Sequence, residues 1–257
     1  MQEILSFLGR LLAALAPSED GKADEPAPDE KVSTADTTPG WDGPGPYRYV
    51  DVSRWQGTID WAQVKAAGYR GAMLRAVGNR AGKPYVDPTF ETNYAGATAA
   101  GLDVGAYYYA KATTKAGADK ELTMLRSALA GKTFTMPIAV DVEDGLLTAL
   151  SQQKLTDLVA YELGEVEKMG FYAQLYTYTS FAENRLYMGG AALKPYDVWL
   201  ADYTGKTPKV DFAYSAHQHT SKGSVPGISG NVDLNVTTVN YPRIIRKKGL
   251  TRLRESA

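Results

Sequence analysis

The chain has 257 residues, a length that suits one large domain or two small ones. Its hydrophobic fraction of 44% and charged fraction of 22% are typical of a globular protein and exclude disorder over the whole length. The formal net charge of -1 argues against a general nucleic-acid binder. The absence of cysteine excludes disulfides, zinc–thiolate sites and a cysteine nucleophile, and two histidines are too few for a three-histidine metal site.

Residues 1–46 are expected to lie outside the folded domain. Apolar residues recur at helical spacing over 1–16, which predicts an amphipathic segment. Glu3 and Arg10 interrupt its apolar stretch, so no clear signal peptide is predicted, and the segment falls short of the about 20 apolar residues of a membrane span. Residues 17–46 hold six of the 13 prolines and many acids, which predicts a linker.

From Tyr47 onward, short apolar runs alternate with helical stretches, a pattern typical of βα units and a parallel sheet. Strands are predicted over 47–51, 72–77, 104–109, 136–142, 172–178, 198–201 and 213–219. Helices are predicted over 61–67, 88–100, 116–129 and 151–169. This order predicts an irregular (β/α) barrel of the TIM type over residues 47–242, with a β-rich last third where helical periodicity fades.

Residues 243–257 carry six basic residues against one acidic residue. This segment is assigned as a basic C-terminal tail. A frayed helix, an electrostatic anchor to an anionic surface and a solvated end remain open for it.

Four acidic residues fall at predicted strand ends, where a parallel barrel places its chemistry. Asp51 closes the first strand, Asp141 and Glu143 close the fourth, and Asp233 lies in GNVDLN, which is predicted to be the last short strand. Residues i and i+2 of a strand point to the same side, so Asp141 and Glu143 are expected to face the barrel mouth together. The competing interpretation is that such acids cap loops or pair with arginine.

Two carboxyls held side by side cannot both ionise freely, so one of them becomes a proton donor at neutral pH. We expect the charge of Asp141, together with partial desolvation, to raise the pKa of Glu143. A donor of this kind protonates a glycosidic oxygen, while a second carboxylate stabilises the oxocarbenium charge. The spacing therefore favours glycoside hydrolysis with Glu143, Asp141, Asp51 and Asp233 as the catalytic set.

Aromatic side chains near the same strand ends predict a sugar-binding cleft, because flat rings stack on sugar faces. The candidates are Tyr107, Tyr109, Tyr176, Trp199 and Trp55. Core packing is the alternative for each ring, and it is favoured for Trp199. His217 and His219 share one strand face and offer a metal-binding alternative, but no metal or cofactor is expected. Ser53 has no suitably placed histidine base for a serine hydrolase.

Five segments together resemble glycoside hydrolase family 25, the muramidases of bacteria, fungi and bacteriophages. They are DVSRWQGTIDWAQVKAAG (51–68), GAYYYA (105–110), PIAVDVED (137–144), VWLADY (198–203) and HQHTSKGSVPGISGNVDLN (217–235). The resemblance implies a barrel of five βα units followed by extra strands. It also implies hydrolysis of the β-1,4 bond between N-acetylmuramic acid and N-acetylglucosamine in peptidoglycan.

Carried over by position, Glu143 is similar to the family's catalytic acid and Asp141 to its partner. Asp51 and Asp233 resemble two further acids of that site, and Tyr107 and Gln218 match positions that line the cleft. The chain departs from the family where histidines flank Gln218 instead of an aromatic pair. It also departs at Tyr108 and Tyr109, where the family usually has His or Phe.

Two other functions stay open on the sequence. A chitinase-like N-acetylglucosaminidase also places D-x-E at a strand end, although Met136 and Ala139 stand where its longer motif needs acids. A non-catalytic wall-binding module on the same fold is the second alternative. The expected partner is the glycan strand of peptidoglycan, with no nucleic acid and no stable membrane span, and a monomer is expected. The expected place of action is the bacterial cell wall, for a phage endolysin released from the host cytoplasm or for a secreted enzyme.

Overall fold

The computed structural model describes residues 46–254, so the predicted segments 1–16 and 17–46 lie outside the described residues apart from Pro46. The strands are β1 (Tyr47–Val52), β2 (Gly71–Arg80), β3 (Lys83–Val86), β4 (Asp103–Tyr109), β5 (Ile138–Asp141), β6 (Ala173–Tyr178), β7 (Asp197–Ala201), β8 (Ala216–Gly223) and β9 (Val232–Thr237). The helices are α2 (Trp61–Ala66), α3 (Phe90–Ala99), α4 (Lys115–Leu129), α5 (Gln152–Lys168), α6 (Thr179–Arg185) and α7 (Tyr241–Lys247). Two 3₁₀ turns, η1 (Arg54–Gln56) and η2 (Gly145–Ala149), follow β1 and β5.

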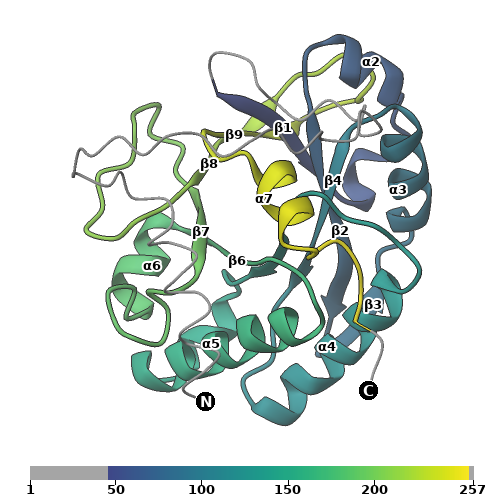
Figure 1. The fold of residues 1–257 in the computed structure, drawn as a ribbon. Helices are drawn as coiled ribbons and strands as arrows, with labels where there is room; N and C mark the ends of the chain where they lie inside the picture. Colours follow the sequence, from purple (N-terminus) through teal and green to yellow (C-terminus); the bar gives the residue numbers. More distant parts are fainter. Residues whose placement is uncertain (1–45, 255–257) are drawn as a thin grey trace, which may run out of the picture.

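Eight of the strands close into a barrel with helices around it (Figure 1). Strands β1, β2, β4, β5, β6, β7 and β8 pair in parallel, in that order. Strand β9 closes the barrel by pairing antiparallel with both β8 and β1, and β3 folds back on β2 as a hairpin. The predicted irregular (β/α) barrel is confirmed. The β-rich last third is confirmed too, since β7, β8 and β9 follow one another without an intervening helix.

Alternation along β5 shows how one strand serves two cores. Ile138 and Val140 are fully buried in the layer between the barrel and its helices, whereas Ala139 lies in the cluster that fills the barrel interior. This is the period-2 geometry that also turns Asp141 inward. The interior is tightly filled at Gly105 of β4, where a Cβ would lie 2.4 Å from the Met73 sulfur and 2.5 Å from the Pro137 carbonyl oxygen.

Helix α5 illustrates why the outer helices form where the sequence predicts them. Ser151 caps its N-terminus by accepting a hydrogen bond from the Lys154 amide. Leu155, Val159 and Val166 are fully buried or nearly so on the barrel face, and burying each such side chain stabilises the fold by about 1.5–3 kcal/mol. The chain leaves the helix at Gly170, whose φ of 98° suits glycine.

The basic C-terminal segment packs on the barrel. Helix α7 lies across the barrel end opposite the strand C-termini (Figure 1), and Tyr241, Ile245 and Leu250 are buried in the interior cluster. Arg246 forms a 2.9 Å ion pair with Asp103. The boundary predicted at residue 242 therefore falls inside α7, and the assignment of residues 243–254 as a separate tail is wrong. Apolar residues within the basic run, which a count of charges does not register, anchor this segment to the barrel.

No helix within residues 46–254 has both the length and the apolar character needed to cross a membrane.

Candidate active site

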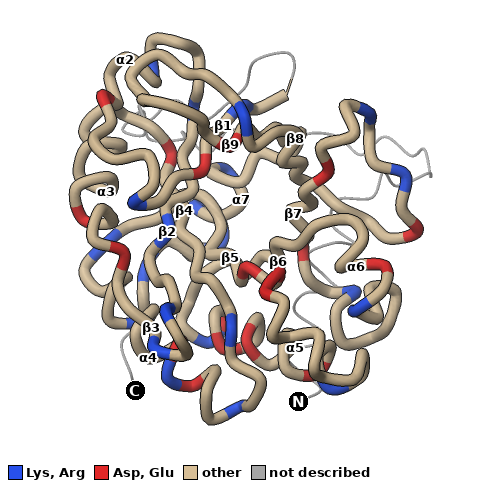
Figure 2. The backbone as a smooth tube through the Cα atoms, turned by 180° about the vertical axis from the view of Figure 1, so that it is seen from behind, with Lys and Arg blue, Asp and Glu red and all other residues tan. Residues whose placement is uncertain are grey.

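The structure brings the four acids predicted as catalytic to one end of the barrel. Asp51 lies near the C-terminal end of β1, Asp141 ends β5, and Glu143 follows two residues later. Asp233 lies at the start of β9, and because β9 runs antiparallel to β1, it stands directly opposite Asp51. Seen from the side opposite to α7, acidic positions gather at the end of β5 beside β6, near the centre of the barrel (Figure 2).

Asp51 is held rigidly by buried amides. It is 4% exposed, and its Oδ2 accepts hydrogen bonds from Gln218 Nε2 at 2.9 Å and Asn235 Nδ2 at 2.7 Å. The two amides are themselves oriented, because Tyr176 donates to Gln218 Oε1 at 2.9 Å and Trp199 Nε1 donates to Asn235 Oδ1 at 2.8 Å. This network fixes both the position of the carboxyl group and the direction of each amide.

All four acids have pKa values above their ordinary range, mainly because of burial. Burial, then the charge of Asp233, raises the pKa of Asp51 well above that of a free aspartate. The carboxyl groups of Asp51 and Asp233 also hydrogen-bond to each other, and burial raises the pKa of Asp233 to about 6. Burial and the charge of Glu143 raise the pKa of Asp141. The site therefore retains protons at pH values where free carboxyls have lost them.

Glu143 combines a raised pKa with access to a cleft. Burial is the largest cause of its raised pKa, followed by the charges of Asp233 and Asp144. This corrects the expectation that Asp141 supplies the charge. Asp141 is only 5% exposed and is itself a buried acid that resists ionisation, so it offers little negative charge to its neighbour.

The pKa of Asp144, the next residue after Glu143, is lowered instead of raised. Burial opposes its ionisation, but hydrogen bonds from the Leu146 amide, Lys111 and Tyr109 outweigh burial and lower the pKa of Asp144. The Lys111 ammonium lies 3.0 Å from the carboxylate, and the Tyr109 hydroxyl donates at 3.0 Å. Two consecutive carboxyls thus have pKa values pushed apart, the arrangement that assigns one as acid and the other as a fixed charge.

A cleft of about 540 Å³ opens beside Glu143, between the ends of β6 and β7. Its walls include Tyr176, Tyr178 and Tyr203, of which Tyr178 is 39% exposed and Tyr203 is 52% exposed. A larger hollow of about 720 Å³ lies between α5 and α6, but none of the four acids lines it. The cleft next to the proton-donating group is therefore the candidate substrate site, with aromatic walls suited to sugar rings.

A raised-pKa carboxyl in an aromatic cleft at a barrel mouth is the arrangement expected of a glycosidase. Residues 50–228 match the family described as glycosyl hydrolases family 25. The chain belongs to family 25. That assignment confirms the resemblance drawn from the five sequence segments, and it makes the chain a member of a family of glycosyl hydrolases.

Named relatives agree with this assignment. The chain is 30% identical over 186 residues to the autolytic lysozyme of Clostridium acetobutylicum, covering 72% of this chain but 54% of that protein. It is 28% identical over 232 residues to lysozyme M1 of Streptomyces globisporus, covering 85% of this chain and 74% of that one. The chain thus spans about half the length of the clostridial relative.

Solved structures show the same fold. The CTP1L endolysin superposes with a TM-score of 0.66 at 28% identity, covering 78% of this chain and 69% of that one. A family 25 glycosyl hydrolase from Bacillus anthracis has a TM-score of 0.66 at 21% identity, covering 77% and 92% of the two chains. The second comparison supports the barrel alone.

The predicted aromatic residues take different places in this family 25 barrel. Tyr107 is half-buried, and burial followed by the charge of Asp51 raises its pKa, which puts it among the acids. Tyr176 lines the cleft, and Trp55 stands on the turn after β1 with 73% of its surface exposed. Trp199 is 1% exposed and packs edge-on against Tyr176 inside the barrel, so it is a core residue, the alternative favoured for it, and not a sugar-stacking one.

Sequence reasoning missed two residues of the site. Asn235 lies two positions after Asp233 in β9, so strand periodicity places both on one face and marks Asn235 as a neighbour of the acids. Tyr203 ends the VWLADY segment, and its hydroxyl donates to Gln218 Oε1 at 2.5 Å. Only the fold shows that this tyrosine bridges the cleft wall and the amide that orients Asp51.

The paired histidines do not assemble a metal site. Their rings are 6.0 Å apart, and His217 Nε2 lies 2.9 Å from the Asp202 carbonyl oxygen. Within residues 46–254, no group of three or more potential ligand side chains could hold a metal ion. The expectation that the enzyme needs no metal stays a prediction.

Proposed function

We propose that this chain hydrolyses the β-1,4 bond between N-acetylmuramic acid and N-acetylglucosamine of peptidoglycan, with Glu143 as the general acid. The observation that carries the proposal is Glu143 itself: its pKa is raised by burial and by neighbouring charge, and it lines the cleft. The printed names of the relatives agree, since they include an autolytic lysozyme and an endolysin.

The proposed reaction begins with transfer of the Glu143 proton to the glycosidic oxygen as the bond from that oxygen to the sugar carbon breaks. The positive charge that develops on the sugar ring is stabilised by the remaining carboxylates of the site. Water then adds to that carbon, and its proton returns to Glu143. The carboxyl pair of Asp51 and Asp233 is compatible with an enzyme nucleophile and with participation of the substrate's acetamido group.

Glycan strands of the bacterial cell wall are the proposed partner. Tyr178 and Tyr203 expose aromatic surface to the cleft, and Trp55 exposes more at the rim, which suits stacking on successive sugars. We propose that the chain acts at the cell wall as a monomer, either after release from a host cytoplasm or after secretion. Size-exclusion chromatography coupled to light scattering tests the monomer.

Mass spectrometry of muropeptides tests the bond assignment. Purified cell walls are digested with the protein, the fragments are reduced with borohydride, and the reduced sugar is identified. We expect reduced N-acetylmuramic acid. Reduced N-acetylglucosamine would instead identify an N-acetylglucosaminidase, and walls that bind the protein without yielding fragments would identify a non-catalytic binding module.

A further inference from the structure

The turn after β1 presents a cation and an aromatic ring together at the rim of the mouth. Arg54 is half-buried, Trp55 is 73% exposed, and both follow Asp51 by only a few residues. Gln56 Nε2 donates to the Asn231 carbonyl oxygen at 3.2 Å, two residues before Asp233. The turn therefore lies beside the Asp51–Asp233 pair, on a part of the rim other than the Tyr178 and Tyr203 walls.

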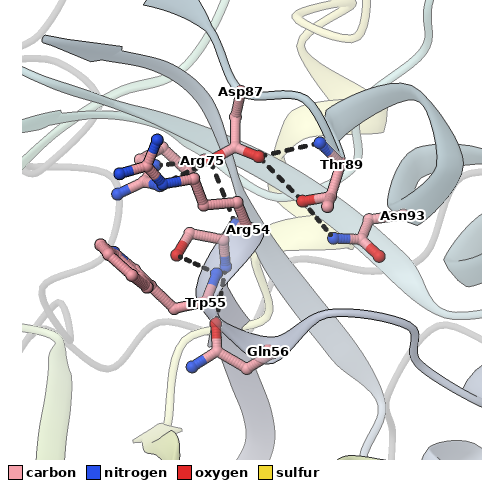
Figure 3. A network of polar contacts seen from close by, with 8 residues as sticks. Arg54, Trp55, Gln56, Arg75, Asp87, Thr89 and Asn93 are labelled. Carbon is pink, nitrogen blue, oxygen red and sulfur yellow. Dashed lines mark hydrogen bonds and ion pairs between the residues drawn. The ribbon is translucent and has the colours of Figure 1, made fainter. Parts of the chain in front are cut away.

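This turn is anchored without the side chains of Arg54 and Trp55. The buried Asp87 carboxylate accepts a hydrogen bond from the Arg54 amide at 3.1 Å and pairs with Arg75 at 2.7 Å (Figure 3). Ser53 and Gln56 form a reciprocal capping box around the same turn. Since the Asp87 contact uses the Arg54 backbone amide and the capping contacts use the side chains of Ser53 and Gln56, the Arg54 side chain is not needed to hold the turn.

The Arg54 guanidinium is held in place but has no acidic partner. Its central carbon lies 4.6 Å from the centroid of the Trp55 ring and 5.5 Å from that of Tyr85. No ion pair or side-chain hydrogen bond joins it to another residue of the described part of the chain, and Asp87 is occupied by Arg75 and Thr89. Ring contacts restrain the guanidinium while leaving its five N–H donors for a ligand.

We propose that Arg54 and Trp55 form a subsite for a carboxylate carried by the glycan strand, with Trp55 against a sugar ring and Arg54 paired to the carboxylate. The inference rests on the proposed function. Peptidoglycan supplies carboxylates from two sources, the stem peptide and, once the peptide is removed, the lactyl group of muramic acid. A guanidinium fork matches a carboxylate in two parallel hydrogen bonds, which neither a hydroxyl nor an amide can accept as strongly.

The subsite also changes how strongly the barrel mouth attracts an anionic polymer. Asp233, which is ionised above its pKa of about 6, repels an anionic polymer, while a cation at the rim attracts it and sets its register. Arg54 therefore separates peptidoglycan from uncharged N-acetylglucosamine polymers, which have the same backbone bond but no carboxylate.

The experiment compares Arg54→Gln with wild type on three soluble substrates: peptide-bearing wall glycan, glycan stripped of peptide by an amidase, and stripped glycan whose carboxyls are converted to amides. Arg48→Gln is the matched control. The Arg48 guanidinium also lies over an aromatic ring, 4.5 Å from the centroid of Tyr69, but Arg48 is near the start of β1 and not on the turn that carries Arg54. We expect Arg54→Gln to lower kcat/KM about fivefold more on the carboxylate-bearing substrates than on the amidated one. Arg54→Lys should recover only part of this loss, and Arg48→Gln should show no such preference.

Binding separates this inference from the proposed function. Glu143→Gln and the double variant Glu143→Gln, Arg54→Gln are titrated with the same three substrates, so the affinities do not depend on turnover. A greater loss on one carboxylate-bearing substrate than on the other identifies the stem peptide or the lactyl group as the source. An equal loss on charged and amidated glycan would overturn the inference, whether or not muramic acid is the new reducing end. The melting temperature of each variant checks that the fold is intact.

Discussion

Asp51 and Asp233 face each other directly across the antiparallel pair of β1 and β9, and their carboxyl groups share a hydrogen bond. Such a pair holds a proton that two separate carboxylates would release near pH 4. Gln218 and Asn235 both donate to Asp51 Oδ2, but burial and the charge of Asp233 outweigh these hydrogen bonds and raise the pKa of Asp51 well above its usual value, whereas the pKa of Asp233 rises only to about 6. The shared proton therefore lies on Asp51, and Asp233 carries the negative charge that raises the pKa of Glu143.

Glu143→Gln removes the transferable proton while keeping the size of the side chain. General acid catalysis contributes about 10²–10⁴-fold, so wall hydrolysis should fall by at least that much. The melting temperature should stay the same or rise, because a buried group that resists ionisation is replaced by a neutral amide. Turbidity clearing and thermal unfolding measure the two effects.

Glu183→Gln is the matched control for that variant, since Glu183 is exposed on α6 and far from the acid cluster in sequence. Its hydrolysis rate should equal that of wild type. If Glu143→Gln keeps more than about a tenth of wild-type hydrolysis, the general-acid assignment is wrong. The donor would then have to be sought at Asp51 or Asp233.

Asp233→Asn should move the alkaline limb of the pH profile to lower pH. Glu143 must be protonated to act, and the charge of Asp233 is the largest contribution, after burial, to the raised pKa of Glu143. Removing that charge lowers the pKa of Glu143, so activity is lost at a lower pH. The limb is measured as kcat/KM against pH on soluble wall glycan.

Asp141→Asn provides the comparison, because Asp141 is the neighbour that sequence spacing alone implicates. It should lower the rate but shift the alkaline limb less than Asp233→Asn does. A larger shift from Asp141→Asn would restore Asp141 as the source of the charge on which Glu143 depends.

Catalysis should not require a divalent ion. The proposed chemistry uses carboxyl groups alone, and the described residues offer no closed ligand set. Wall hydrolysis after dialysis against a chelator should equal that of untreated enzyme. Loss of activity that returns on addition of zinc would revive the paired-histidine alternative at His217 and His219.

Ile245→Ala tests whether the basic C-terminal segment is part of the folded barrel. Ile245 is fully buried at the end of the barrel that α7 covers, so truncating it should lower the free energy of unfolding by about 2–5 kcal/mol. Ile244→Ala is the control, because Ile244 is only half-buried on the same helix. Denaturant unfolding that gave equal small losses for both variants would show that α7 does not support the core.

Glu162→Gln should stabilise the protein increasingly as pH rises. Burial, then the charge of Glu121, raises the pKa of Glu162 well above its ordinary value of 4.5, so the folded protein keeps a proton that the unfolded chain releases. The stability contributed by this proton is complete below about pH 4.5 and is lost as pH rises toward the folded pKa.

The melting temperature of Glu162→Gln should therefore exceed that of wild type by about 2–4 °C at pH 8, with little difference at pH 4. Glu165→Gln on the same helix is the control, since Glu165 pairs with the exposed Lys168 at 2.6 Å. A gain of equal size at both pH values would point to packing rather than to proton release.

Local pattern was enough to predict the barrel and to select its acids. Strand and helix periods depend on neighbouring residues, which is why Ser151 could be predicted as the start of α5 and why Asp141 and Glu143 could be expected at the same end of one strand. Asp51 could be selected because it closes a short apolar run, and Asp233 because it lies in GNVDLN, the segment predicted to be the last short strand. None of these inferences needs knowledge of which strand lies beside which.

Closure of the barrel decided which buried residues face its interior and which face its helices. It creates two apolar environments that a period-2 pattern cannot distinguish. Trp199 and Ala139 face the interior while Val140 faces the helices, and all three read as equally buried in sequence. The pairing of β9 with β1, which sets the charge acting on Glu143, joins residues 182 positions apart, as the register of Asp51 with Asp233 shows. Contacts of that range depend on the path of the whole chain, so only the tertiary structure could place Asn235 and Tyr203 around Asp51, or seat Ile245 in the barrel.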